Sequence, residues 1–117
     1  MRHAILVMLV LAACGKSEDK PLRQFEQSKA DIARVTAKKY AYEAYPQWAA
    51  AHADKECPDT ITALDEYMND KDHVDPWGHA YLMKCGKDLP AGVRGMAVSS
   101  AGPDGTPGTA DDVTSWN

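Results

Sequence analysis

The stretch that most restricts what this 117-residue chain can fold into lies near its C-terminus, at residues 99–113 (Ser-Ser-Ala-Gly-Pro-Asp-Gly-Thr-Pro-Gly-Thr-Ala-Asp-Asp-Val). Its three glycines and two prolines exclude a helix and predict a turning loop. It also holds three aspartates, and no Lys or Arg follows Arg94 to neutralise them. Carboxylates, hydroxyls and carbonyls are ligands that Ca²⁺ prefers, although the spacing is not that of an EF-hand. Composition alone leaves a calcium-binding loop and a solvated acidic turn both open.

A second motif, Asp-Pro-Trp-Gly-His-Ala-Tyr at residues 75–81, lies upstream of this loop. It is followed by Ser-Ala-Gly-Pro-Asp-Gly at residues 100–105 and by Asp-Asp-Val at residues 111–113. In this order the motifs resemble the C-terminal half of the major pseudopilin of type II secretion systems, over roughly residues 30–113. The resemblance implies an α+β fold of the pilin-head type, in which a long N-terminal α-helix packs on a small antiparallel β-sheet.

The resemblance also implies a ligand set, because the loop of that family binds calcium. Carried over by position, the ligands are the carboxylates of Asp104 and Asp111, the carbonyls of Ala101 and Thr106, and the hydroxyl of Thr109. Asp112 is adjacent and is expected to add charge without direct contact. Pro103, and Thr109 in place of the family's Ser, depart from the pattern and bear on the geometry of the loop.

The N-terminus departs from that family. A short basic start and an apolar run from Ala4 to Ala13 indicate a signal peptide, too short to cross a bilayer, which needs around 20 residues. Residues 11–14 (Leu-Ala-Ala-Cys) resemble a bacterial lipobox, which implies removal of residues 1–13 and acylation of Cys14. The alternative is an ordinary cleaved signal. Gly15 after the cysteine favours the outer membrane, facing the periplasm or the cell surface.

The polar residues after Cys14 predict a flexible tether over residues 14–21, followed by one head domain at residues 22–117. Helical periodicity runs from Leu22 to about Ala53, with Pro46 expected to kink or break it. Its large apolar residues are assigned to the core, with alanines beside them: Phe25, Ile32, Val35, Tyr42 and Tyr45. The first turns are too polar for lipid, so we do not expect a filament subunit.

The remaining segments predict short elements. Residues 60–68 indicate a short helix capped by Thr60. Residues 80–85 and 95–100 indicate strands, and residues 113–116 a third. Trp77 is expected to fill the gap between helix and sheet, and its indole N–H needs a partner.

With Cys14 acylated, Cys57 and Cys85 remain as an even pair in an exported protein. A disulfide is the default in that compartment. It would close a loop of about 29 residues and stabilise the fold by roughly 3–4 kcal/mol. Two free thiols or a metal pair are the alternatives, and the spacing has no zinc-motif form.

Catalytic signals are weak. His73, Asp75 and His79 are close enough in sequence for a zinc site, but no hydrolase or phosphate-loop motif is present, and we do not expect an enzyme. Removing the signal peptide changes the net charge from −4 to −5, which argues against nucleic acid.

The leading interpretation is a calcium-stabilised, membrane-anchored envelope lipoprotein with a structural or interaction role accessory to type II secretion. Its expected partners are the lipid bilayer and envelope or secretion-system proteins. The alternatives are a stand-alone envelope binding module and a His-dependent metal hydrolase.

Overall fold

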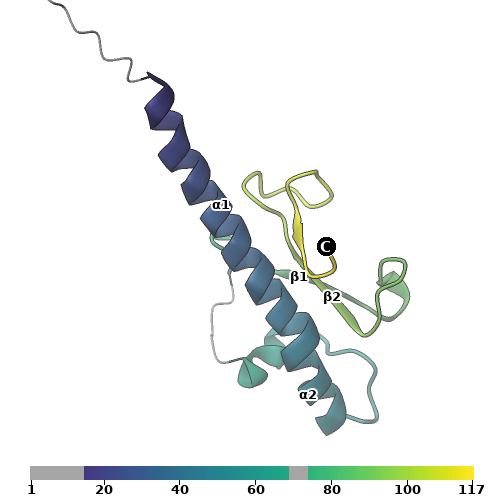
Figure 1. Cartoon of the computed structure of the whole chain (residues 1–117). Helices are drawn as coiled ribbons and strands as arrows, with labels where there is room; N and C mark the ends of the chain where they lie inside the picture. The colour runs from purple at the N-terminus through teal and green to yellow at the C-terminus, as the bar shows by residue number, and fades with distance from the viewer. Residues whose placement is uncertain (1–14, 69–73) are drawn as a thin grey trace, which may run out of the picture.

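The computed structural model describes residues 15–68 and 74–117, with the backbone alone for residues 15–21. A long helical rod is made of α1 (Gly15–Lys39), the π-helical turn η1 (Tyr40–Ala44) and α2 (Tyr45–Ala51). Two 3₁₀ turns follow along the chain, η2 (Ile61–Tyr67) and η3 (Gly86–Asp88). The strands are β1 (Leu82–Cys85), β2 (Met96–Ser100) and β3 (Val113–Thr114). Figure 1 shows the sheet beside the rod, with the first turns of α1 extending past it, so the predicted α+β architecture is confirmed.

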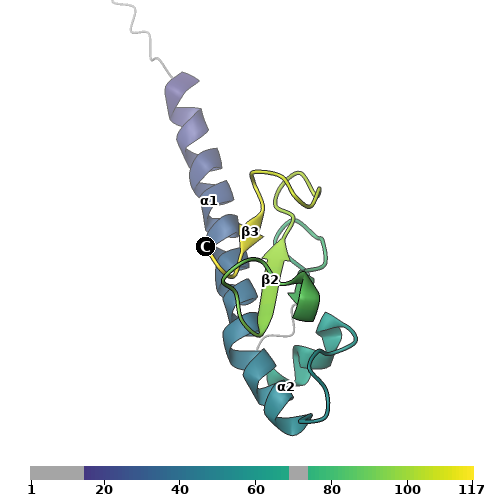
Figure 2. The same ribbon diagram turned by 90° about the vertical axis from the view of Figure 1, so that its right-hand side faces the viewer.

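The three strands form one antiparallel sheet in the order β1-β2-β3. Leu82 of β1 lies opposite Ser99 of β2, and Ser99 lies opposite Thr114 of β3, so these three side chains form one row across the sheet. The views in Figures 1 and 2 place the sheet on one side of the helical rod. Strands were predicted at each of these places, and the third is shorter than expected.

The rod passes through Pro46 without breaking. Proline has no N–H for the carbonyl four residues back, and its ring crowds that carbonyl. The wider π-helical turn η1 lies just before it, and there the N–H of Tyr45 bonds the carbonyl of Tyr40, five residues earlier. A π turn of this kind absorbs one extra residue while the helix continues. The kink or break expected at Pro46 is therefore a single π-helical turn, through which the helix continues.

The face of the rod that packs on the sheet is not the one predicted. Phe25, Ile32, Val35 and Tyr42 are between 54% and 58% exposed, and Tyr45 is half-buried. The buried face consists instead of four alanines and two aromatic residues: Ala33, Ala37, Ala41 and Ala44, with Tyr40 and Trp48. Small side chains let the rod approach the sheet closely, because a large side chain at the same position would hold the two apart. The assignment to the core was wrong for the four exposed residues, whereas Tyr45 does pack against the core.

The start of the rod also differs from the prediction. The helix was expected to begin at Leu22 after a flexible tether, whereas α1 begins at Gly15. Lys and Glu are good helix formers, and extending an existing helix adds one hydrogen bond for each residue fixed. Cys14 lies outside the described residues. Among the helices of the described residues, none has the length and apolar character that crossing a membrane requires.

The segment predicted as a short capped helix is the 3₁₀ turn η2. Thr60 precedes it, but its hydroxyl bonds the hydroxyl of Thr62 at 2.7 Å instead of capping the turn. Leu64 and Met68 of this segment are buried against the rod. η2 therefore closes the core at the α2 end of the rod.

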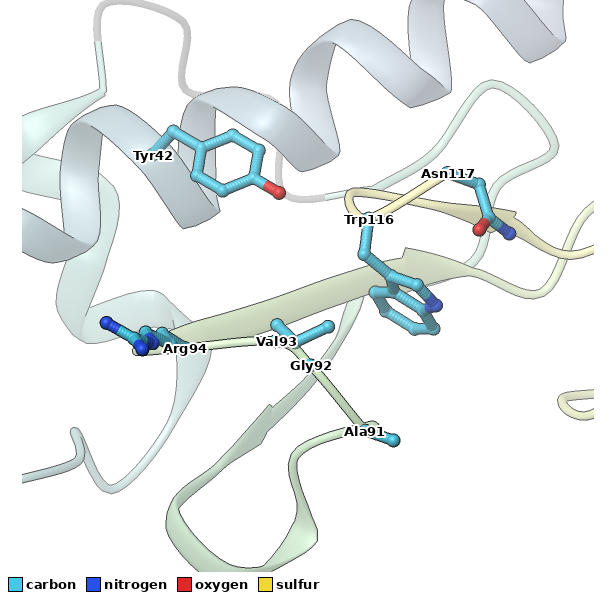
Figure 3. Close-up of a pocket in the computed structure, with 7 residues that line it drawn as sticks. All are labelled: Tyr42, Ala91, Gly92, Val93, Arg94, Trp116 and Asn117. Atoms are coloured by element: carbon cyan, nitrogen blue, oxygen red, sulfur yellow. The ribbon is translucent and has the colours of Figure 1, made fainter.

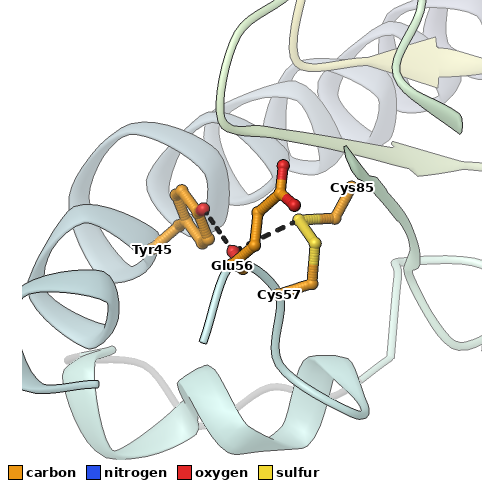
Figure 4. The surroundings of a disulfide bond; sticks show 4 residues. All are labelled: Tyr45, Glu56, Cys57 and Cys85. Carbon is orange, nitrogen blue, oxygen red and sulfur yellow. Dashed lines mark hydrogen bonds between the residues drawn. A yellow bond between two sulfur atoms is a disulfide. The ribbon is translucent and has the colours of Figure 1, made fainter. Parts of the chain in front are cut away.

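A disulfide ties the link after α2 to the end of β1. Cys57 and Cys85 are joined, with 5.9 Å between their Cα atoms. Figure 4 shows the surroundings: the Tyr45 hydroxyl donates to the carbonyl of Glu56 at 2.6 Å, next to the bond. The structure thus contains the predicted pairing, and the disulfide fixes the end of the sheet farthest from the acidic loop.

Candidate functional site

The acidic loop is held to the rest of the protein through the buried carboxylate of Asp75, which is 3% exposed. Its Oδ1 accepts from the N–H groups of Trp77 (3.0 Å) and His79 (2.8 Å). Its Oδ2 accepts from the Ser100 hydroxyl at 2.6 Å, and that hydroxyl oxygen accepts from the Gly102 N–H at 3.1 Å. A buried carboxylate is stable when its oxygens are hydrogen-bonded in this way. Asp75 therefore joins the two sequence motifs physically.

The same contacts bear on the zinc site considered from sequence. Both oxygens of Asp75 accept hydrogen bonds within the fold, and Nδ1 of His79 lies 3.9 Å from Oδ1. His73 lies outside the described residues. The role of Asp75 in the described structure is to fix the turn and the start of the loop.

Trp77 secures this turn to the helical rod. Its indole N–H donates to the carboxylate of Glu26 in α1 at 2.9 Å, which supplies the partner that the sequence required. The ring is half-buried and packs against the core, as expected for a side chain between helix and sheet.

The loop leaves β2 and returns to β3 at the pair Ser100 and Val113. Gly102 has a φ of +77°, and a Cβ there would lie 2.3 Å from the carbonyl oxygen of Asp111. Only glycine satisfies both the left-handed backbone and the close approach. This contact brings the two ends of the loop together and places Asp111 beside its start.

Three carboxylates converge inside the loop. One oxygen each from Asp104, Asp111 and Asp112 lie within 4.8 Å of one another. The Thr109 hydroxyl lies among them, at 2.8 Å from Asp104 Oδ2 and 3.3 Å from Asp112 Oδ1, and it also bonds Asp111 Oδ1. The Thr106 carbonyl oxygen is 3.0 Å from the same hydroxyl.

This arrangement holds more acceptors than donors. A hydroxyl has one hydrogen, so the Thr109 hydroxyl cannot donate fully to four surrounding oxygens at once. Backbone N–H groups serve other carboxylate oxygens: the N–H of Asp104 lies 3.2 Å from Asp111 Oδ2, and that of Gly108 lies 2.8 Å from Asp112 Oδ2. The hydrogen bond from Thr109 is the main cause that lowers the pKa of Asp111 below its usual value. The cluster thus offers carboxylate, hydroxyl and carbonyl oxygens, the donor atoms that suit a hard cation.

Of the five predicted ligands, the structure brings together Asp104, Thr106, Thr109 and Asp111. Ala101, the fifth, is buried where the loop leaves β2. Asp112 was expected only to add charge, and its carboxylate lies in the cluster with the other two. The Asp-Asp pair was the available signal, because neighbouring residues in a turn can both direct their side chains to one point.

Together, the helical rod, the small antiparallel sheet and the closing acidic loop define a pilin-type head. A family model described as type II secretion system (T2SS), protein G matches residues 22–116. The chain belongs to this pseudopilin family, which is structural, and the family places it in type II secretion and at the cell envelope. Comparison with curated proteins and comparison with solved structures each returned no match.

Proposed function

We propose that this protein is a calcium-stabilised pseudopilin-type head carried on a lipid anchor at Cys14, with a structural or interaction role accessory to type II secretion. Membership of the family supports the role in secretion. The observation that carries the calcium proposal is the convergence of Asp104, Asp111 and Asp112 around one hydroxyl. A Ca²⁺ ion at this cluster would neutralise carboxylates that the loop's own donors satisfy only in part.

Calcium binding to the folded state alone would raise stability by RT ln(1 + [L]/Kd), about 2.7 kcal/mol at a hundredfold excess of calcium over Kd. The test is a set of thermal melts in millimolar Ca²⁺ and in EGTA. We expect Ca²⁺ to raise the melting temperature of the native protein and EGTA to reverse the change. Asp111→Asn should remove the response, whereas Asp54→Asn, at an exposed aspartate outside the loop, should retain it. Superimposable melts, together with no binding heat in calorimetry, would show that the loop is only an acidic turn.

The lipid anchor rests on the lipobox-like residues 11–14. Mass spectrometry of the mature protein should find a diacylglyceryl group on an N-terminal Cys14, and Cys14→Ser should abolish it. An unmodified protein released freely into the periplasm would refute the anchor while leaving the calcium proposal untouched. Separation of the inner and outer membranes would then locate the anchored form.

The role in secretion is tested in cells. Deleting the gene should reduce export of a type II substrate, and the native chain supplied in trans should restore it. Unchanged export together with a normally folded, membrane-bound protein would instead favour a stand-alone binding module of the envelope.

A further inference from the structure

Trp116 lies between two cavities on the head. The first, of about 610 Å³, is lined by Tyr42, Arg94 and the link at residues 91–93, with Asn117. Figure 3 shows Tyr42 reaching from the helical rod toward the chain at Trp116, with Arg94 at the other end of the cavity. The second cavity, of about 530 Å³, lies over the sheet face that carries Leu82, Ser99 and Thr114. Because Trp116 lines both, the two cavities are neighbours along one surface.

The second cavity contains a polar group without a partner. Thr114 is 8% exposed, and its hydroxyl has no hydrogen-bond partner among the described residues. Leaving a buried hydroxyl unpaired costs about 1–3 kcal/mol, so such groups are uncommon in folded proteins. The hydroxyl oxygen itself is closed off from solvent, so a ligand lying over the sheet would reach it once the Thr114 side chain rotates toward the cavity.

The charges of this surface differ from those of the whole protein. The chain has a formal net charge of −4, yet the charged side chains lining the two cavities are Lys84, Arg94 and Asp112. Asp112 already accepts from the Gly108 N–H and the Thr109 hydroxyl. The two cations are exposed, and no ion pair joins either of them to an acidic group in the described residues. With two cations and one carboxylate, the side chains that line the two cavities have a net positive charge.

The apolar part of the surface comes from Leu82, Pro107 and Trp116. Trp, Tyr and Arg are the side chains most enriched where proteins bind proteins tightly, and Tyr42, Arg94 and Trp116 gather in the first cavity. The wall of the second cavity is mainly apolar, whereas that of the first is more polar, so the two together offer both kinds of contact to an extended peptide segment.

We propose that the cavities on either side of Trp116 form one binding groove for a protein partner, which inserts an extended segment of alternating apolar and acidic residues. Apolar side chains of the segment contact Leu82 and Trp116, and its carboxylates pair with Lys84 and Arg94. A polar group of its backbone bonds the Thr114 hydroxyl, which rotates toward the groove on binding. This groove borders the carboxylate cluster, because Asp112 belongs to both, and it does not depend on the lipid anchor.

The test uses an acetylated, amidated pentapeptide of alternating glutamates and leucines, titrated into ¹⁵N-labelled protein in a calcium-containing buffer. A peptide with lysines in place of the glutamates, and one with serines in place of the leucines, serve as matched probes. We expect the first peptide to shift the backbone amides of Ser99 and Thr114 and the indole signal of Trp116. The other two should bind on the order of tenfold more weakly.

Charge reversal tests the role of the cations. The double variant Lys84→Glu/Arg94→Glu should bind the acidic peptide about tenfold or more weakly and should gain affinity for the lysine peptide. Lys38→Glu/Lys87→Glu makes the same change in net charge at exposed residues outside both cavities, and should bind as the native protein does.

Thr114→Val tests the unpaired hydroxyl without charge. Removing an unpaired buried hydroxyl should leave the melting temperature unchanged or raise it, while peptide binding should weaken about threefold or more. The proposal is overturned if the acidic and basic peptides shift the same amides equally, if no peptide shifts these signals at millimolar concentration, or if Thr114→Val binds the acidic peptide like the native protein.

Discussion

The helix–sheet core and the acidic loop of this protein are held in their shapes by different forces. Ala37 of the rod, Leu64 of η2 and Val98 of β2 are each fully buried, and apolar contact fixes the core. In the loop, the contacts are hydrogen bonds from hydroxyl and backbone donors to exposed or partly exposed aspartates, such as the bond of 2.9 Å from the Thr106 N–H to Asp104. The core therefore needs no ion to keep its geometry, whereas the geometry of the loop depends on the charge of its carboxylates.

The largest expected loss of stability comes from removing the disulfide of the helix–sheet core, which tests whether the core is held independently of the loop. Replacing both Cys57 and Cys85 by serine should lower the free energy of unfolding by roughly 3–4 kcal/mol, because the unfolded chain regains the entropy of a loop of about 29 residues. Chemical denaturation of the native and double-variant proteins measures the difference. An equal loss upon adding reductant to the native protein is the control. A double variant as stable as the native protein would mean that the two cysteines are not joined.

A smaller effect on the core is expected from Ala37→Leu. Ala37 is 0% exposed on the rod, so the added atoms must push the rod away from its neighbours, and we expect a loss of about 1–3 kcal/mol. Lys38→Leu, one residue along and exposed, should change stability by no more than about 0.5 kcal/mol. Denaturant titration compares the two variants, and equal effects would contradict the buried alanine face.

The loop should respond less than the core when calcium is chelated. Asp111→Asn in EGTA removes one anionic acceptor from an exposed network, and it should lower stability less than either change above. Its clearest effect should be local, as faster amide hydrogen exchange at Asp104, whose N–H donates to Asp111. Unchanged exchange in β2 serves as the internal reference. Loss of protection throughout the head would show that loop and core unfold together.

The smallest expected effect is the pH dependence of this network. The Thr109 hydroxyl is the main cause that lowers the pKa of Asp111, so the folded carboxyl holds its proton less tightly than the unfolded one. Its contribution to stability is present above the unfolded pKa and is lost as pH falls through the folded pKa. Melting temperatures of the native protein and Asp111→Asn in EGTA should therefore converge in acid. A gap that persists unchanged at low pH would contradict this assignment.

The sequence predicted the element order but not which side of the helix faces the sheet. Phe25, Ile32 and Val35 looked like core residues because large apolar side chains usually are. Residue size alone cannot reveal that the sheet approaches along the small side chains of Ala33 and Ala37, since that depends on contacts between distant segments. The π-helical turn was equally hidden, because Pro46 predicts a disturbance without specifying its form.

The candidate site was more predictable because its parts are local. The positions of Asp104, Thr109 and Asp111 are close in sequence, and the glycines between them allow the tight turns that bring their side chains together. The hydrogen bond from Ser100 to Asp75 was not predicted, because it spans 25 residues and forms only after β2 is in place. The groove beside Trp116 was also missed, since three strands and a loop contribute to it.

The start of α1 at Gly15 has a mechanical consequence if Cys14 is held in lipid as proposed. Eleven residues separate Gly15 from Glu26, where Trp77 fastens the head, and at about 1.5 Å per residue the helix spans roughly 16 Å. The head is then held by a rigid helix and not by a flexible tether. The helix fixes both the distance of the head from the anchor and its rotation about the helix axis. One residue inserted into this part of the helix would move the head about 1.5 Å farther from the anchor and rotate it by about 100° about the helix axis. An insertion of seven residues would restore nearly the original orientation.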